Sequence, residues 1–253
     1  LMVAAIDISG RPLPAGGAVG TRPSRAGSFR RMLARVLPQL DTLFVYLDGF
    51  DRIPADLAAD PRCRCVLTPG TGCLHAASRF LAPAALGADA VFCLFDDDIL
   101  YPPDYVATIT RALASLDGAA LVGYHATVFV PPHRSYVRDR RTLHFAQALA
   151  RRTVVHELGS GTLAFVSTRF RPDPARRAHA DMNDLYVAAE ALDADLPLVA
   201  LERAADWLVP IAEHQDDSLW RATVRDERRQ TELMRYVIAR HVLPVRTDWW
   251  TGR

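Results

Sequence analysis

Three consecutive aspartates, Asp96 to Asp98, are the residues of this chain whose types and spacing most clearly indicate chemistry. Adjacent carboxylates repel one another, and a divalent cation with hard oxygen ligands is a low-cost counter-charge for them. An ordinary solvated turn needs only one Asp or Asn, so three in a row exceed that need, although this simpler interpretation stays open. The sequence therefore predicts a divalent cation site in this loop.

The residues on either side of the aspartates predict the elements that position them. Residues 91–95 are all apolar, with the length and bulk typical of a strand buried on both faces of a parallel sheet. Pro102 and Pro103 suit the first turn of a helix, because proline lacks the N–H group that would be unsatisfied there. The expected order is strand, acidic loop, helix.

Alternating strand and helix patterns in the first hundred residues predict an α/β fold with a mixed, mostly parallel sheet flanked by helices. Apolar residues at helical spacing predict a helix over residues 28–40, after a loop over residues 10–23 that is rich in Gly and Pro. Ligands of such sheets lie off the carboxyl ends of the strands, where Asp48 and Asp96 are expected. The other expected elements of this half are strands over residues 2–8, 43–47 and 64–67 and a helix over 76–86.

The pattern changes after the helix that follows Pro103, and we see no repeat or low-complexity linker. The expected strands here are residues 119–124, 126–130, 154–158, 162–167 and 198–201, and the expected helices are 142–150, 181–192 and 226–242.

The composition restricts the function classes. Thirty basic and twenty-nine acidic residues leave a net charge of +1, so no global field attracts nucleic acid. All the basic residues are arginines, which excludes lysine chemistry and leaves Arg, backbone N–H groups or a metal to bind phosphate. No apolar run approaches the ~20 residues of a membrane helix. We expect a cytoplasmic location, with peripheral membrane association left open.

Four stretches resemble the bacterial family-2-like glycosyltransferases of GT-A fold, especially those of capsular and surface polysaccharide synthesis. The most specific is residues 95–106, Phe-Asp-Asp-Asp-Ile-Leu-Tyr-Pro-Pro-Asp-Tyr-Val. The others are residues 21–25, residues 39–51, and residues 158–162 with 180–185 downstream. The resemblance implies one Rossmann-like GT-A domain over residues 1–253. Its nucleotide-binding front would be residues 1–106, and its acceptor-binding rear residues 107–253.

The resemblance also implies a metal-dependent transfer of sugar from a nucleoside-diphosphate sugar, expected to be a UDP-sugar, to a saccharide acceptor. Mn²⁺ or Mg²⁺ would stabilise the leaving diphosphate as a Lewis acid. The implied metal ligands are Asp98 and Asp96 of the Asp-x-Asp motif, with Asp96 alternatively on the ribose, Asp97 as a supporting charge, and His214 as a candidate late ligand. The implied donor contacts are Thr21, Arg25, Asp48, Arg79, Asp96, Asp97, Gly159, Ser160, Gly161 and Thr162.

Some of these assignments have structural alternatives. Arg79 stands where such enzymes often have a Lys, and a guanidinium can also bind phosphate, but a surface arginine on an amphipathic helix is the alternative. The turn over residues 159–162 can equally be an ordinary hairpin turn. His125 and His156 are candidate substrate contacts, and Tyr101 and Trp207 are candidate stacking residues. Structural roles are the alternative for all four.

An inverting transfer needs a carboxylate that deprotonates the acceptor hydroxyl. The resemblance implies that this base lies at the start of the helix after the turn, where Asp181 and Asp184 are the candidates. Asp184 is favoured because it directly precedes the apolar run that begins at Leu185, as the corresponding Asp of the family does. An N-cap role is the alternative for either residue, and a retaining reaction would need no such base.

Two rival functions remain. One is a sugar-nucleotide or glycan-binding module without turnover. The other is a nucleotidyltransferase, which normally has a Gly-rich and basic loop after its first strand. Gly16, Gly17 and residues 22–25 partly provide that loop.

Overall fold

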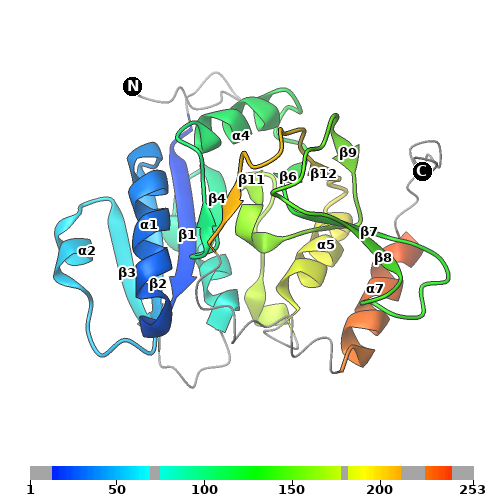
Figure 1. Ribbon diagram of the computed structural model, residues 1–253, viewed down its shortest axis with the longest axis horizontal. Helices are drawn as coiled ribbons and strands as arrows, with labels where there is room; N and C mark the ends of the chain where they lie inside the picture. Colours follow the sequence, from blue (N-terminus) through cyan, green and yellow to red (C-terminus); the bar gives the residue numbers. More distant parts are fainter. Residues whose placement is uncertain (1–12, 69–74, 178–181, 212–225, 241–253) are drawn as a thin grey trace.

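The computed structural model describes residues 13–68, 75–177, 182–211 and 226–240, and its centre is an eight-stranded mixed sheet (Figure 1). The strands are β1 Ala15–Thr21, β2 Thr42–Asp48, β3 Cys63–Thr68, β4 Val91–Phe95, β6 Leu121–Gly123, β9 Thr153–Val154, β11 Ala164–Val166 and β12 Leu198–Ala200. Their order across the sheet is β3-β2-β1-β4-β11-β6-β12-β9.

Most of these strands run in the same direction. β3, β2, β1 and β4 are parallel neighbours, whereas β11 is antiparallel to both β4 and β6. β6 and its parallel neighbour β12 therefore run in the direction of β4. The start of β11 lies at the sheet edge where β1, β2 and β4 end, so the segment before β11 reaches the acidic loop.

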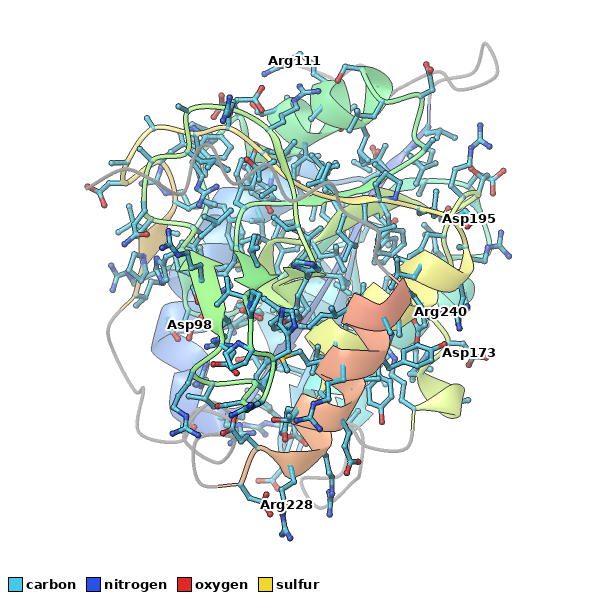
Figure 2. The ribbon with its side chains drawn as sticks, turned by 90° about the vertical axis from the view of Figure 1, so that its right-hand side faces the viewer. Asp98, Arg111, Asp173, Asp195, Arg228 and Arg240 are labelled. Atoms are coloured by element: carbon cyan, nitrogen blue, oxygen red, sulfur yellow. The ribbon has the colours of Figure 1, made fainter. Side chains whose placement is uncertain are left out.

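Helices cover both faces of the sheet (Figure 1). Side chains alternate along a strand, and in β2 Leu43, Val45 and Leu47 belong to the hydrophobic cluster that includes residues of α1 and α4, whereas Phe44 and Tyr46 belong to the cluster of the other face, which includes residues of α5 and α7. Figures 1 and 2 both show α7 beside α5. The helices are α1 Ala26–Val36, α2 Ala55–Ala59, α3 Ala82–Leu86, α4 Tyr105–Ala114, α5 Asn183–Asp193 and α7 Arg228–Arg240, with 3-10 helices η1 Pro23–Arg25, η2 Leu37–Gln39, η3 His75–Leu81, η4 Ser160–Thr162 and η5 Pro174–Arg176.

Two small sheets complete the fold. A three-stranded antiparallel sheet is formed by β10 (Glu157–Leu158), β7 (Ala126–Phe129) and β8 (Arg140–Leu143). β5 (Ile99–Leu100), directly after the aspartates, pairs with β13 (Val209–Pro210). None of the described helices is long and apolar enough to cross a membrane.

The expected loop over residues 10–23 is wrong, because Ala15–Thr21 is the strand β1 at the centre of the sheet. Two glycines of β1 leave space for aromatic rings of β4. A Cβ on Gly16 would lie 3.0 Å from the Phe92 ring, and one on Gly17 would lie 2.6 Å from the Phe95 ring. Gly16 and Gly17 thus serve packing inside the sheet. The strand expected over residues 2–8 lies outside the described residues.

The expected helix over residues 142–150 is also wrong. Its start belongs to β8, and residues 144–150 form a turn and a single bridge between Leu149 and Arg203. The Arg203 guanidinium donates hydrogen bonds to the backbone carbonyls of residues 143–145. In a helix, these carbonyls would accept hydrogen bonds from the helix's own N–H groups. Strands 43–47, 64–67 and 91–95 and the helix after Pro103 are confirmed, whereas residues 154–158 divide into β9 and β10.

Candidate functional site

The acidic loop follows β4 at the edge where the parallel strands end. Asp97 points into the protein, and only 5% of its side chain is exposed. The Thr21 hydroxyl donates to Asp97 at 2.7 Å, and Arg25 Nη1 donates to it at 2.9 Å. Burial raises the Asp97 pKa, while the bonds from Thr21 and Arg25 oppose that rise. Asp97 thereby ties the loop to β1 and to the arginine before α1.

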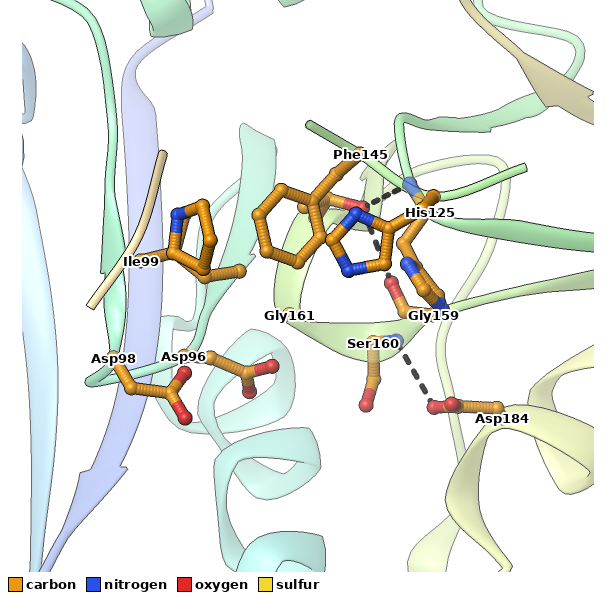
Figure 3. Close-up of a pocket in the computed structure, with 12 residues that line it drawn as sticks. Asp96, Asp98, Ile99, His125, Phe145, Gly159, Ser160, Gly161 and Asp184 are labelled. Carbon is orange, nitrogen blue, oxygen red and sulfur yellow. Dashed lines mark hydrogen bonds between the residues drawn. The ribbon is translucent and has the colours of Figure 1, made fainter. Parts of the chain in front are cut away.

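Asp96 and Asp98 point instead into a pocket of about 550 Å³ (Figure 3). The Asp96 side chain is 40% exposed and that of Asp98 is 21% exposed. Arg25 Nη1 also donates to Asp98 at 3.2 Å, so one guanidinium contacts two of the three aspartates. The pocket is lined by Asp96, Asp98, Ile99, His125, His144, Phe145, Gly159, Ser160, Gly161, Thr162, Asp184 and Pro210.

Arg79, from η3, joins the acidic loop to the turn over residues 159–162. Its side chain is buried, and Nη1 donates to the Phe95 carbonyl at 2.7 Å and to Asp96 at 2.5 Å. Nη2 donates to the Ser160 hydroxyl at 2.7 Å. The guanidinium therefore lies beneath the pocket floor, in contact with two residues that line it.

The turn over residues 159–162, predicted as a donor contact, forms η4 and the floor of the pocket. Gly161 lies against Asp96, and a Cβ on this glycine would overlap the Asp96 carboxyl group. The Tyr101 hydroxyl donates to the Gly161 carbonyl at 2.5 Å and accepts from the Asp96 N–H at 2.9 Å. Thr162 accepts backbone N–H bonds, one of them from His125 at 2.8 Å.

Asp184, in the first turn of α5, lies across the pocket from the acidic loop (Figure 3). Its Oδ1 accepts a hydrogen bond from the Ser160 N–H at 2.9 Å, and Met182 is the N-cap of the helix. Burial raises the Asp184 pKa, and the Ser160 bonds and the Arg79 charge oppose this. A carboxylate with a raised pKa is better suited to accept a proton than an ordinary aspartate.

Behind the turn lies a second acidic group, Glu157 on β10, which the sequence analysis did not single out. It is 3% exposed, and the Tyr136 hydroxyl donates to its Oε1 at 2.8 Å. Within the described part of the chain, its Oε2 has no hydrogen-bond partner. Burial and the nearby negative charge of Asp184 raise the Glu157 pKa to about 8.

The remaining wall of the pocket consists of His125, His144 and Phe145, with Ile99 and Pro210 beside the acidic loop. The His125 ring packs against Gly159, where a Cβ would lie 2.8 Å from it. His144 and Phe145 were not predicted as site residues. Their sequence gives no signal of this position, because Arg203 from a distant part of the chain fixes them there.

Other predicted residues lie outside the pocket lining. Asp48 is at the end of β2 on the same sheet edge, with its carboxylate 3.8 Å from Arg22. His156 is buried, and its Nδ1 accepts the Phe129 N–H at 3.1 Å. Tyr101 and Trp207 both pack against Tyr105. Asp181 and His214 lie outside the described residues.

Asp96 and Asp98 have the donor chemistry for a hard divalent cation. No cluster of three or more His, Cys, Asp or Glu side chains that could hold a metal occurs among residues 13–68, 75–177, 182–211 and 226–240. Mg²⁺ is nevertheless usually bound by one or two carboxylates together with substrate phosphates and water. Two carboxylates facing one pocket fit that mode of binding.

No protein-family model matches the sequence, and no curated protein matches it either. Among solved structures, the chain is similar to the inositol-1-phosphate CTP transferase from T. maritima, with a TM-score of 0.50, 12% identity, and coverage of 88% of this chain and 95% of that chain. It is also similar to a mannosyltransferase from Pyrobaculum calidifontis in complex with GDP-Man and Mn²⁺, with a TM-score of 0.53, 14% identity, and coverage of 94% and 73%. This likeness concerns the fold, and it confirms a GT-A-like α/β fold with a mixed, mostly parallel sheet flanked by helices.

Proposed function

We propose that this protein is a metal-dependent glycosyltransferase that moves a sugar from a nucleoside-diphosphate sugar to a saccharide acceptor with inversion of configuration. The observation that carries the proposal is the placement of Asp96 and Asp98 across one pocket from Asp184. Two carboxylates suit a cation on the diphosphate, and a third, separate carboxylate suits a proton acceptor. The expected donor is a UDP-sugar and the expected role is surface polysaccharide synthesis, as the resemblance of residues 95–106 implies.

In this proposal the donor lies at the edge where β1, β2 and β4 end. Asp96 and Asp98 would hold Mn²⁺ or Mg²⁺, and the bound cation would supply Lewis-acid stabilisation of the leaving diphosphate. Thr21 and Asp48, at the ends of β1 and β2, are the proposed nucleoside contacts. Arg25, beside the aspartates, is the proposed phosphate contact. The Mn²⁺ and GDP-Man of the mannosyltransferase with a similar fold support a metal and a nucleotide sugar here.

Asp184 accepts the proton of the attacking hydroxyl in this proposal. Its raised pKa and its fixed bond to the Ser160 N–H support that role. The hydrogen bonds of Arg79 to Asp96 and Ser160 hold the metal side and the base side of the pocket at a fixed separation.

A nucleotidyltransferase is the second candidate, since a CTP transferase shares the fold. Its characteristic Gly-rich loop is not supported by the position of Gly16 and Gly17, which pack inside β1 against Phe92 and Phe95. Only Arg22 separates β1 from η1, which leaves little room for a phosphate loop. We therefore favour sugar transfer over nucleotidyl transfer.

A nucleotide panel tests this proposal. Thermal unfolding would be measured with UDP, GDP, CDP, UDP-glucose, UDP-galactose, GDP-mannose and CTP, each with Mn²⁺ and with EDTA, because a ligand that binds the native state raises the unfolding temperature. Sugar transfer predicts a shift with a nucleoside-diphosphate sugar that needs Mn²⁺, followed by release of the nucleoside diphosphate. Pyrophosphate release from CTP, with a phosphorylated acceptor such as inositol 1-phosphate present to take the cytidylyl group, would favour the rival function. Binding without any turnover would favour a non-catalytic module.

A further inference from the structure

The pocket wall facing the acidic loop and Asp184 consists of packed aromatic rings. His144 and Phe145 stack with ring centroids 4.3 Å apart, and the His125 ring meets His144 edge to face at 5.2 Å. All three residues are partly buried and line the pocket (Figure 3). We call His125, His144 and Phe145 the aromatic wall.

Arg203 fixes the aromatic wall from behind. Its guanidinium is buried and donates to the carbonyls of Phe145 at 3.1 Å, His144 at 2.7 Å and Leu143 at 3.2 Å. The fourth acceptor is the carbonyl of Leu201. These bonds hold the backbone of residues 143–145 in an irregular conformation that presents two adjacent rings to one pocket.

The two imidazoles of the wall are neutral at neutral pH. Burial lowers the His125 pKa to about 4, and burial lowers the pKa of His144 as well. The His144 Nδ1 accepts the Ala146 N–H at 3.2 Å, so its Nε2 carries the proton and can donate. Within the described residues, the buried His125 Nδ1 has no hydrogen-bond partner. The imidazoles of the wall are therefore polar but uncharged.

The two sides of the pocket differ in charge, so each side suits a different part of the ligands. The arginine that contacts the acidic loop, Arg25, is on the metal side and suits an anionic diphosphate. Neutral imidazoles do not attract a diphosphate. A pyranose ring suits the aromatic wall instead, because it has an apolar C–H face for an aromatic ring and hydroxyls for neutral donors and acceptors.

We propose that the aromatic wall, His125, His144 and Phe145, is the acceptor subsite and binds an uncharged saccharide, with Arg203 as the positioning residue that holds it. This inference rests on the proposed function, and it assigns the acceptor a place in the same pocket. The bound ring lies over η4, where its hydroxyl can approach Asp184.

Saturation-transfer NMR with methyl glycosides tests the subsite. The probes are the methyl α- and β-glycosides of glucose, galactose, mannose and N-acetylglucosamine, added to the whole chain with UDP and Mn²⁺. We expect saturation transfer to at least one glycoside. Phe145→Ala should weaken its affinity by about tenfold or more, since the loss of a ring's apolar contact area is worth about one such factor. UDP affinity in Mn²⁺ should change by less than about twofold.

Two further variants complete the design. Tyr236→Ala removes an exposed ring on α7 and should leave glycoside binding unchanged. Arg203→Met should weaken glycoside binding while UDP binding persists, a split that general loss of structure would not produce. His144→Gln, which keeps a side-chain donor, should retain more affinity than His144→Ala.

The outcomes separate this inference from the proposed function. Equal losses of UDP and glycoside affinity in Phe145→Ala would assign the wall to the nucleobase and overturn the subsite. Unchanged glycoside binding in Phe145→Ala, or no signal from any glycoside, would overturn it as well. If UDP does not bind and glycoside binding still depends on Phe145, the subsite stands and the transferase proposal fails.

Discussion

The carboxyl group of Asp96 occupies the space that a β-carbon at position 161 would need, so only Gly161 permits the observed contact. The Tyr101 hydroxyl secures the same contact, since it bonds both the Gly161 carbonyl and the Asp96 N–H. The acidic loop and the turn over residues 159–162 are thereby held together at the pocket floor. The position of Asp96 depends on the absence of a side chain in a distant part of the sequence.

Replacing Gly161 with Ala should therefore displace Asp96. We expect Mn²⁺-dependent UDP affinity to fall by about tenfold or more, because misplacing a metal ligand disturbs the whole coordination shell. Isothermal titration with UDP in Mn²⁺ and in EDTA measures the effect. Gly27→Ala is the matched control, because a Cβ there meets nothing within 4 Å. Unchanged UDP affinity in Gly161→Ala would remove Asp96 from the metal site.

Replacing Asp98 with Asn should abolish the metal dependence of nucleotide binding. Asp98 is partly exposed and paired with Arg25, so the fold should persist while a charged cation ligand is lost. EDTA should weaken UDP binding by the wild-type protein and have little effect on the variant. Asp56→Asn is the control, because Asp56 is an exposed aspartate also paired with an arginine, Arg30. If the variant kept wild-type UDP affinity in Mn²⁺, the acidic loop would not be the metal site.

Replacing Asp184 with Asn should leave donor binding near the wild-type value and lower turnover by about two to four orders of magnitude. The Asn oxygen can still accept the Ser160 N–H, so the pocket geometry should be kept. In the wild type, activity should decline on acidification at a pH above the ordinary range of an aspartate, because the Asp184 pKa is raised. Asp193→Asn, at the other end of α5 and paired with Arg240, is the control. Full transfer activity in Asp184→Asn would place the base elsewhere or indicate a retaining reaction.

Replacing Glu157 with Gln should make the protein progressively more stable than the wild type as the pH rises. The folded-state pKa is raised from 4.5 to about 8, so the protonated acid is favoured in the folded chain. The wild-type protein keeps its full free energy of unfolding below the pKa that Glu157 has in the unfolded chain. It loses up to about 1.4 kcal/mol per pH unit as the pH rises from that value through the folded-state pKa. Urea unfolding at about pH 5.5 and about pH 8.5 measures the gap, which is the difference in unfolding free energy between the variant and the wild type, and we expect it to be larger at the higher pH. Glu202→Gln, an exposed residue paired with Arg152, should leave the gap constant. A constant gap for Glu157→Gln would show that Glu157 ionises normally.

The acidic loop and its strand could be predicted because their signals are local. Five apolar residues from Val91 to Phe95 need burial on both faces, and they alternate between the two hydrophobic cores in the structure. The strand β1 could not be predicted in the same way. Its Gly16 and Gly17 look like loop residues until the Phe92 and Phe95 rings that fill their side-chain space are known.

The aromatic wall shows the same limit more strongly. The apolar spacing of residues 142–150 favours a helix, and no neighbouring residue contradicts that pattern. The opposing interaction comes from Arg203, whose buried guanidinium is satisfied only if carbonyls of residues 143–145 turn toward it. A contact between residues so distant in the sequence leaves no periodic signal, so His144 and Phe145 were not foreseen as part of the pocket lining.

The guanidinium of Arg25 bonds to both Asp97 and Asp98, and this affects how the proposed site would bind a cation. Because Arg25 donates to both Asp97 and Asp98, it neutralises part of their charge and gives the loop an internal counter-charge. An arriving cation would exchange one electrostatic partner of Asp98 for another instead of folding the loop. Binding and release of the cation would then leave the surrounding β-sheet unstrained, and a chelator should remove a bound cation without unfolding the protein.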